Sequence, residues 1–174
     1  TASLAFAGAI AKQLLKEKGI SVAAHIKSIK DIKDRDIEEK DITEENIEKL
    51  RNMLLPVFEE KKISEMEELI LKAREDGDSI GGVIEVMATG VPAGIGDPFF
   101  ESMESELSRM IFSVPATKGI EFGAGFDIAR MTGYEANDEM YYDADGRVKS
   151  YTNNNGGITG GITNGMPISF KVAK

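Results

Sequence analysis

Apolar and polar positions repeat with two different periods along the chain, and the change of period predicts where helices and strands lie. From Ser3 to Lys18 the apolar residues recur every three to four positions, as in an amphipathic helix, and Gly19 suits the position just after its end. Residues 20–29 then alternate with a period of two, which predicts a strand. His25 falls on the more polar side of that strand, so we expect a surface histidine rather than a catalytic one.

The next part of the chain, about residues 31–62, mixes acidic and basic residues and is called here the charged segment. Its mixture of signs is typical of a solvated surface rather than of a binding site for an acidic ligand. Thr43 is a suitable N-cap for a helix that Pro56 ends. Ser64 with Glu67 has the capping-box pattern at the start of another helix, and both helices are expected to be structural.

Glycines bracket the strand predicted at 83–87. Glu85 interrupts its apolar run and is expected to face water from one side of an antiparallel sheet. Asp97 followed by Pro98 predicts the start of a helix. The buried stripe of this helix is expected to consist of apolar residues at helical spacing, namely Phe100, Met103, Leu107, Met110 and Ile111.

The remaining chain predicts a strand at 120–122, a short helical turn, a hairpin-like "DADG" turn and a final alternation, "MPISFKVA". Helices and strands therefore follow one another without the regular βαβ order of a parallel sheet. This order predicts an α+β fold in which helices pack on an antiparallel sheet. A length of 174 residues fits one domain.

Composition excludes several kinds of function. The absence of cysteine excludes disulfides and thiolate metal sites, and a single histidine argues against a histidine-rich metal site or a Ser-His-Asp triad. A net charge of −9 argues against nucleic acid as a partner. No apolar run is long enough for a membrane span and no secretory signal pattern is present, so the cytoplasm is the simplest expectation. The chain begins at Thr1 and stops within an alternation, and we expect it to be part of a longer polypeptide.

The stretch "NNNGGITGGITNG" at residues 153–165, called here the glycine-rich loop, carries very little side chain. It is neither a Walker A phosphate loop nor a dinucleotide fingerprint. Three interpretations remain open on composition alone: a flexible loop, a series of tight turns with positive φ, or a cradle of exposed backbone for an anion or a flat ring.

Four stretches together resemble chorismate synthase, in that family's order and spacing. They are "FAGAIAKQLL" (6–15), "GDSIGGVIEVMATGVPAGIGDPFFESMESELSRMIFSVPATKGIEFGAGF" (77–126), "NDE" (137–139) and "NNNGGITGGITNGMPISFKVA" (153–173). The resemblance covers roughly half of the chain, and the charged segment is the part that it does not match. It implies a fold in which helices are sandwiched between antiparallel sheets, with this chain as one partial domain into which the charged segment is inserted.

The resemblance also implies a function. Chorismate synthases eliminate phosphate from 5-enolpyruvylshikimate 3-phosphate by a 1,4-anti route to give chorismate in the shikimate pathway. They use reduced FMN although the reaction has no net redox change, some members also reduce their flavin, and they usually form homotetramers. This chain is accordingly expected to form a homo-oligomer, with the phosphorylated small molecule as substrate.

Carried over by position, the flavin-contacting residues implied for this chain are Pro115, Ala116 and Gly160. The bareness of the glycine-rich loop is then explained by backbone lying against the flavin ring, with Gly156 and Gly157 serving turns. No catalytic residue and no metal ligand is assigned, because the family's catalytic histidines lie in N-terminal segments without a counterpart here. The chain alone is therefore expected to be inactive. The alternatives are a non-catalytic structural or oligomerisation domain that keeps the fold, and a small anion-binding module unrelated to flavin.

Overall fold

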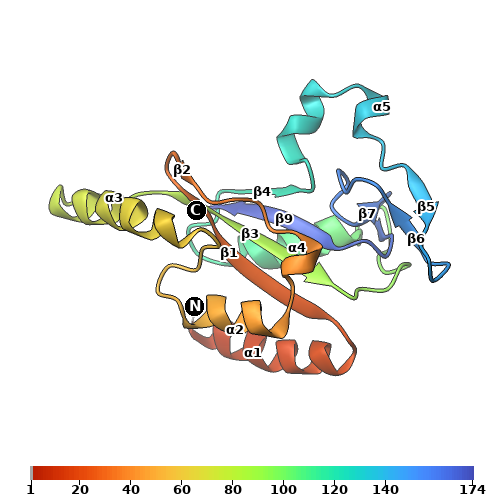
Figure 1. Ribbon diagram of the computed structural model, residues 1–174, viewed down its shortest axis with the longest axis horizontal. Helices are drawn as coiled ribbons and strands as arrows, with labels where there is room; N and C mark the ends of the chain where they lie inside the picture. Colours follow the sequence, from red (N-terminus) through yellow and green to blue (C-terminus); the bar gives the residue numbers. More distant parts are fainter. Residues whose placement is uncertain (1) are drawn as a thin grey trace.

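Five strands form one antiparallel sheet in the order β2–β1–β3–β9–β4 (Figure 1). The computed structural model describes residues 2–174. The strands of this sheet are β1 (Ser21–Ile29), β2 (Ile32–Lys33), β3 (Gly82–Thr89), β4 (Gly119–Phe122) and β9 (Ile168–Ala173). Two short hairpins lie outside it, β5 (Met140–Tyr142) with β6 (Val148–Ser150), and β7 (Ile158–Thr159) with β8 (Ile162–Thr163). The predicted α+β class with an antiparallel sheet is confirmed.

The helices accompany this sheet without alternating regularly with its strands. They are α1 (Ala2–Glu17), α2 (Glu44–Asn52), α3 (Ile63–Glu75), α4 (Met103–Phe112) and α5 (Gly133–Ala136), with 3₁₀ turns at Glu39–Asp41, Glu60–Lys62 and Gly125–Arg130. In Figure 1, α1 and α2 lie side by side, α3 extends away from the sheet, and α5 is grouped with β5, β6 and β7 at the opposite end. Among the described residues, no helix combines the length and apolarity that crossing a membrane requires.

One face of the sheet carries the apolar core. Alternate residues of β9, namely Ile168, Phe170 and Val172, are buried on this face, as the period-two pattern predicts. Residues of α4 pack against them, and these are Met103, Leu107 and Ile111. Burying each large apolar side chain contributes about 1.5–3 kcal/mol, so the packing of α4 on β9 stabilises the strand that directly follows the glycine-rich loop.

The opposite face is polar and is nevertheless buried. The register of β1 with β3 places His25 beside Glu85 and Ala23 beside Met87. His25 is 1% exposed and Glu85 is 5% exposed, so the expectation that both face water is wrong. The reason is that the charged segment does not stay in solvent but folds across this face, where its Ile37 packs against Ala23 and Met87.

The predicted caps have mixed outcomes. Thr43 does cap α2, since its side chain accepts a hydrogen bond from the backbone N–H of Asn46. The capping box of Ser64 is wrong, because α3 begins one residue earlier and no side chain caps it. By contrast, the helix predicted to start at Asp97 starts later, at Met103. The backbones of Asp97 and Glu101 bond to each other, and Ser102 then caps α4.

The late start of α4 changes its buried stripe. Met103, Leu107 and Ile111 face the core as predicted, whereas Phe100 lies before the helix and is 90% exposed. Met110 is also exposed. The predicted turn at Asp143–Gly146 is confirmed, because it joins β5 to β6 with the N–H of Gly146 bonded to the carbonyl of Asp143.

Candidate functional site

A single carboxylate, that of Asp138, fixes the start of the glycine-rich loop. Its Oδ1 accepts hydrogen bonds from the Thr152 hydroxyl at 2.7 Å and from the backbone N–H of Asn154 at 2.7 Å. Its Oδ2 accepts from the backbone N–H of Asn155 at 2.9 Å and from the side-chain amide of the same residue at 2.8 Å. Asp138 is 8% exposed. The "NDE" stretch thus meets the "NNN" stretch in space, which the sequence analysis did not foresee.

The environment of Asp138 keeps its carboxylate ionised. Burial acts to raise its pKa, but the hydrogen bonds from Thr152, Asn155 and Asn154 outweigh burial and hold the pKa below its usual value. An ionised carboxylate is an acceptor only, with room for four donors. All four bonds described above use that capacity, so the loop start is held by a fully satisfied anion.

Three glycines of the loop are required by the protein's own packing. Gly156, Gly157 and Gly161 are buried and have positive φ angles. A Cβ at Gly157 would lie 2.5 Å from the carbonyl oxygen of Pro167, and one at Gly156 would lie 2.5 Å from the backbone nitrogen of Gly123. A Cβ at Gly161 would lie 2.8 Å from that of Ser102. Tight turns and close backbone contact therefore explain these three positions without any ligand.

Gly160 is different. It lies in the turn between β7 and β8, it is exposed, and its φ is +60°. Nothing lies within 4 Å of a Cβ built there, so the protein's own packing does not explain the absence of a side chain. The conformation favours glycine, and the bare backbone leaves a surface against which a flat ring can lie. Gly160 therefore fits the flavin contact implied by the resemblance.

Pro115 and Ala116 lie in an exposed turn between α4 and β4. Ala116 has a φ of +67°, which is uncommon for a residue with a Cβ. The next residue, Thr117, is buried, and among the described residues its hydroxyl has no hydrogen-bond partner. The turn returns to the sheet through the N–H of Lys118, which bonds to the carbonyl of Ala173. An unpartnered hydroxyl beside a shaped, exposed turn is compatible with a ligand contact.

The structure does not bring the two predicted contacts together. The N–H of Met103, at the start of α4, bonds to the carbonyl of Gly161, whereas Pro115 follows the other end of the helix. A helix of ten residues is about 15 Å long. Gly160 and Pro115 therefore lie near opposite ends of α4 in this chain.

A second buried polar cluster surrounds His25. Its Nδ1 lies 3.0 Å from Oδ2 of Asp34, and its Nε2 lies 2.8 Å from Oε2 of Glu85. Asp34 also accepts the backbone N–H groups of Phe58 at 2.6 Å and Glu59 at 2.9 Å. These contacts fasten the charged segment to the sheet. Because both ring nitrogens are engaged and the ring is buried, His25 has no access to a substrate.

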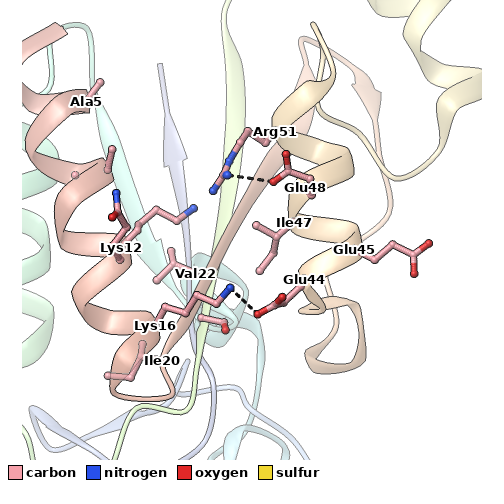
Figure 2. Close-up of a pocket in the computed structure, with 14 residues that line it drawn as sticks. Ala5, Lys12, Lys16, Ile20, Val22, Glu44, Glu45, Ile47, Glu48 and Arg51 are labelled. Atoms are coloured by element: carbon pink, nitrogen blue, oxygen red, sulfur yellow. Dashed lines mark hydrogen bonds and ion pairs between the residues drawn. The ribbon is translucent and has the colours of Figure 1, made fainter.

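An open groove of about 1110 Å³ lies elsewhere, between α1 and α2 (Figure 2). Lys12 projects into it from α1 and Arg51 from α2, while Lys16 pairs with Glu44 across it at 2.7 Å. Burial, helped by the charge of Arg51, lowers the pKa of Lys12. None of the predicted flavin contacts lines this groove. None of the described residues of α1, which forms one wall of the groove, is buried.

Comparison with known proteins agrees with the resemblance. The family model for chorismate synthase matches residues 1–174. A chorismate synthase of Methanobrevibacter smithii is 45% identical over 167 residues, which is 96% of this chain and 44% of the relative. One from Pyrococcus abyssi is 43% identical over 173 residues, which is 99% of this chain and 46% of the relative.

A solved structure extends the comparison to the fold. A crystal structure of chorismate synthase matches with a TM-score of 0.80 and 32% identity, covering 95% of this chain and 52% of that one. The chain thus spans about half the length of the relatives that it matches. Family, motifs and architecture agree, and we conclude that this chain belongs to the chorismate synthase family.

Proposed function

We propose that the polypeptide carrying this chain converts 5-enolpyruvylshikimate 3-phosphate to chorismate by 1,4-anti elimination of phosphate with reduced FMN. The observation that carries the proposal is the state of the glycine-rich loop. Packing inside the chain accounts for three of the loop's five glycines, Gly165 has only ordinary contacts with Ala93, and Gly160 is exposed backbone with open space above it. Family membership over the whole chain supports the same activity.

The residues of this chain serve the cofactor rather than the proton transfers. Gly160 offers a surface without a side chain to the flavin ring, and Pro115 with Ala116 forms a second, separate contact. When bound, reduced FMN supplies electron density to the departing phosphate and a place for the ring proton. The only histidine of the chain, His25, is buried and bonded at both ring nitrogens, so it does not deliver protons to substrate or flavin.

We infer that the 174-residue chain alone is inactive. FMN and the substrate both carry phosphate, and binding phosphate needs fixed cations. A net charge of −9 opposes the binding of two phosphorylated molecules, and we infer that other parts of the enzyme supply the cationic contacts and the acid–base histidines. The view of the chain as one partial domain of a cytoplasmic protein stays a prediction.

The test is a turnover assay in the absence of oxygen. The longest natural polypeptide that carries this chain is incubated with reduced FMN and 5-enolpyruvylshikimate 3-phosphate, and release of phosphate and formation of chorismate are followed together. Equal amounts of both products support the proposal. Flavin binding without either product would favour the alternative, a non-catalytic domain that keeps the fold. Turnover by the 174-residue chain would contradict its assignment as inactive.

Assembly into a homo-oligomer is part of the proposal and has an observation of its own. Apolar side chains of α1 are exposed, Phe6 at 71% and Leu14 at 57%. Such a face is typical of a surface that another element covers. Light scattering coupled to size exclusion measures the oligomer directly, and a monomer at micromolar concentration would contradict this part of the proposal.

A further inference from the structure

We propose that Asp138 is the positioning residue of the flavin-contacting turn: its carboxylate sets where Gly160 stands, although it does not itself touch the ligand. The proposal rests on the function proposed above. It starts from the four hydrogen bonds that converge on this one carboxylate from the residues just before the glycines.

The path from Asp138 to Gly160 is short and consists of hydrogen bonds. The carbonyl of Asn155, whose N–H is held by Asp138, accepts the N–H of Ile158. Ile158 is 2% exposed and begins β7, and Gly160 is two residues further on. Asn153 closes the same turn, because its side-chain oxygen accepts the N–H of Gly157 at 2.8 Å and its amide donates to the carbonyl of Pro167 at 2.8 Å.

The other side of the hairpin is anchored independently. Thr163 at the end of β8 is buried, and its hydroxyl donates to the carbonyl of Pro92 at 2.7 Å. The same hydroxyl accepts the N–H of Ile95 at 2.9 Å. Gly160 therefore lies in a turn that hydrogen bonds hold on both sides, and of the two anchoring residues only Asp138 carries a charge. Loss of the Asp138 anchor frees one side of the hairpin, while Thr163 still holds the other.

The chemistry requires a carboxylate at this position. Two backbone N–H groups, one hydroxyl and one amide all point their hydrogens at the two oxygens of Asp138. An asparagine has a single oxygen and would turn its own NH₂ donors towards donors. A charged acceptor also forms stronger hydrogen bonds than a neutral one. Asp138→Asn therefore keeps the size of the side chain and removes its function, whereas Asp138→Glu keeps both acceptor oxygens.

The experiment measures the Kd for reduced FMN, by fluorescence without oxygen, in the longest natural polypeptide that carries this chain. Wild type is compared with Asp138→Asn, Asp138→Glu and Asp145→Asn, each at a temperature where it is fully folded. Asp145 is a matched control because it is an exposed aspartate at the tip of the β5–β6 hairpin. We expect Asp138→Asn to raise the Kd at least tenfold, Asp138→Glu to recover most of the affinity, and Asp145→Asn to match wild type.

Amide hydrogen exchange provides a second measurement that does not depend on flavin. In Asp138→Asn, exchange should become faster at residues 154–161 and stay unchanged in β9 beyond Ser169, whose N–H bonds to the carbonyl of Gly156. If this variant fails to fold, Thr152→Val removes one of the four donors without changing the shape of the side chain and should raise the Kd about threefold. An unchanged Kd in a folded Asp138→Asn protein overturns the positioning role and leaves the proposed function intact. Absence of flavin binding in wild type overturns the proposed function, and this proposal with it.

Discussion

Two regions of this chain are each held by buried carboxylates, but in different ways. Around His25, two carboxylates face one imidazole, and the donors of the charged segment complete the cluster. Around Asp138, one carboxylate is satisfied entirely by neutral hydroxyl, amide and backbone donors. The first cluster covers a sheet face and has no access to solvent, whereas the second supports a loop whose turn is exposed. The His25 cluster therefore stabilises the fold, whereas the Asp138 cluster positions an exposed turn.

The largest expected effect is on the His25 cluster. His25→Ala leaves Asp34 and Glu85 buried without their shared partner, and removing one member of such a buried cluster of polar side chains costs about 3–5 kcal/mol. Urea unfolding measures the loss. A change in unfolding free energy below about 1 kcal/mol would show that the His25 cluster does not hold the charged segment on the sheet. The stabilising role given to this cluster would then be wrong.

The next effect compares two glycines of one loop. Gly157→Ala forces a Cβ against the carbonyl of Pro167 at a positive φ and should cost about 2–4 kcal/mol. Gly160→Ala meets no atom and should cost only about 1 kcal/mol, for its backbone conformation alone. Thermal unfolding of both variants gives the difference. Equal losses would mean that the loop is uniformly packed and that Gly160 is not special.

The pH dependence of the Asp138 cluster gives a smaller effect. Its pKa is lower in the folded state than in the unfolded chain, so its contribution to stability is fully present above the ordinary carboxyl pKa and is lost as the pH falls through the lowered value. Asp138→Asn should therefore lower the unfolding free energy by about 1–2 kcal/mol at neutral pH. The gap to wild type should close in acid. A gap that stays constant with pH would show that the carboxylate charge does not stabilise the loop.

The smallest effect tests the surface of the charged segment. Thr43→Val removes the side-chain cap of α2 and should cost about 1 kcal/mol, without the larger loss expected at His25. Chemical denaturation compares it with Glu45→Gln, an exposed change in the first turn of the same helix for which we expect a loss of only about 0.3 kcal/mol, from the helix dipole. A cost for Thr43→Val as large as that for His25→Ala would mean that α2, and not the buried cluster, holds this segment in place.

How much the sequence could predict differs between the same two regions. Periodicity predicted α1, β1, β9 and the α+β class, because these elements carry a regular apolar pattern along the sequence. In the structure β9 buries that face, whereas no described residue of α1 is buried. It failed at His25 and Glu85, since a period-two pattern separates two faces but does not show which one a distant segment covers. Here the charged segment covers the polar face with the scattered apolar residues Ile37, Ile42, Ile47 and Phe58, whose spacing does not show where they pack.

In the glycine-rich region the resemblance supplied what local patterns could not. Composition left three interpretations open, and the structure separates Gly160 from the glycines that serve packing. The role of Asp138 in holding the loop could not be predicted, although the residue belongs to a stretch that matches the family. Its partners lie 14 to 17 residues away, and no spacing rule connects them. The late start of α4 was missed because the Asp97–Glu101 turn has the same residue types as a cap.

If the exposed turn of the glycine-rich loop binds flavin, a side chain at Gly160 must weaken that binding, and a titration measures this. Wild type and Gly160→Ala, both in the longest natural polypeptide that carries this chain, are titrated with reduced FMN under conditions where both are folded. The account predicts that wild type binds at micromolar concentration and that Gly160→Ala binds at least tenfold more weakly. Equal affinity of the two proteins would contradict the account, because the absence of a side chain at Gly160 would then have no bearing on the cofactor.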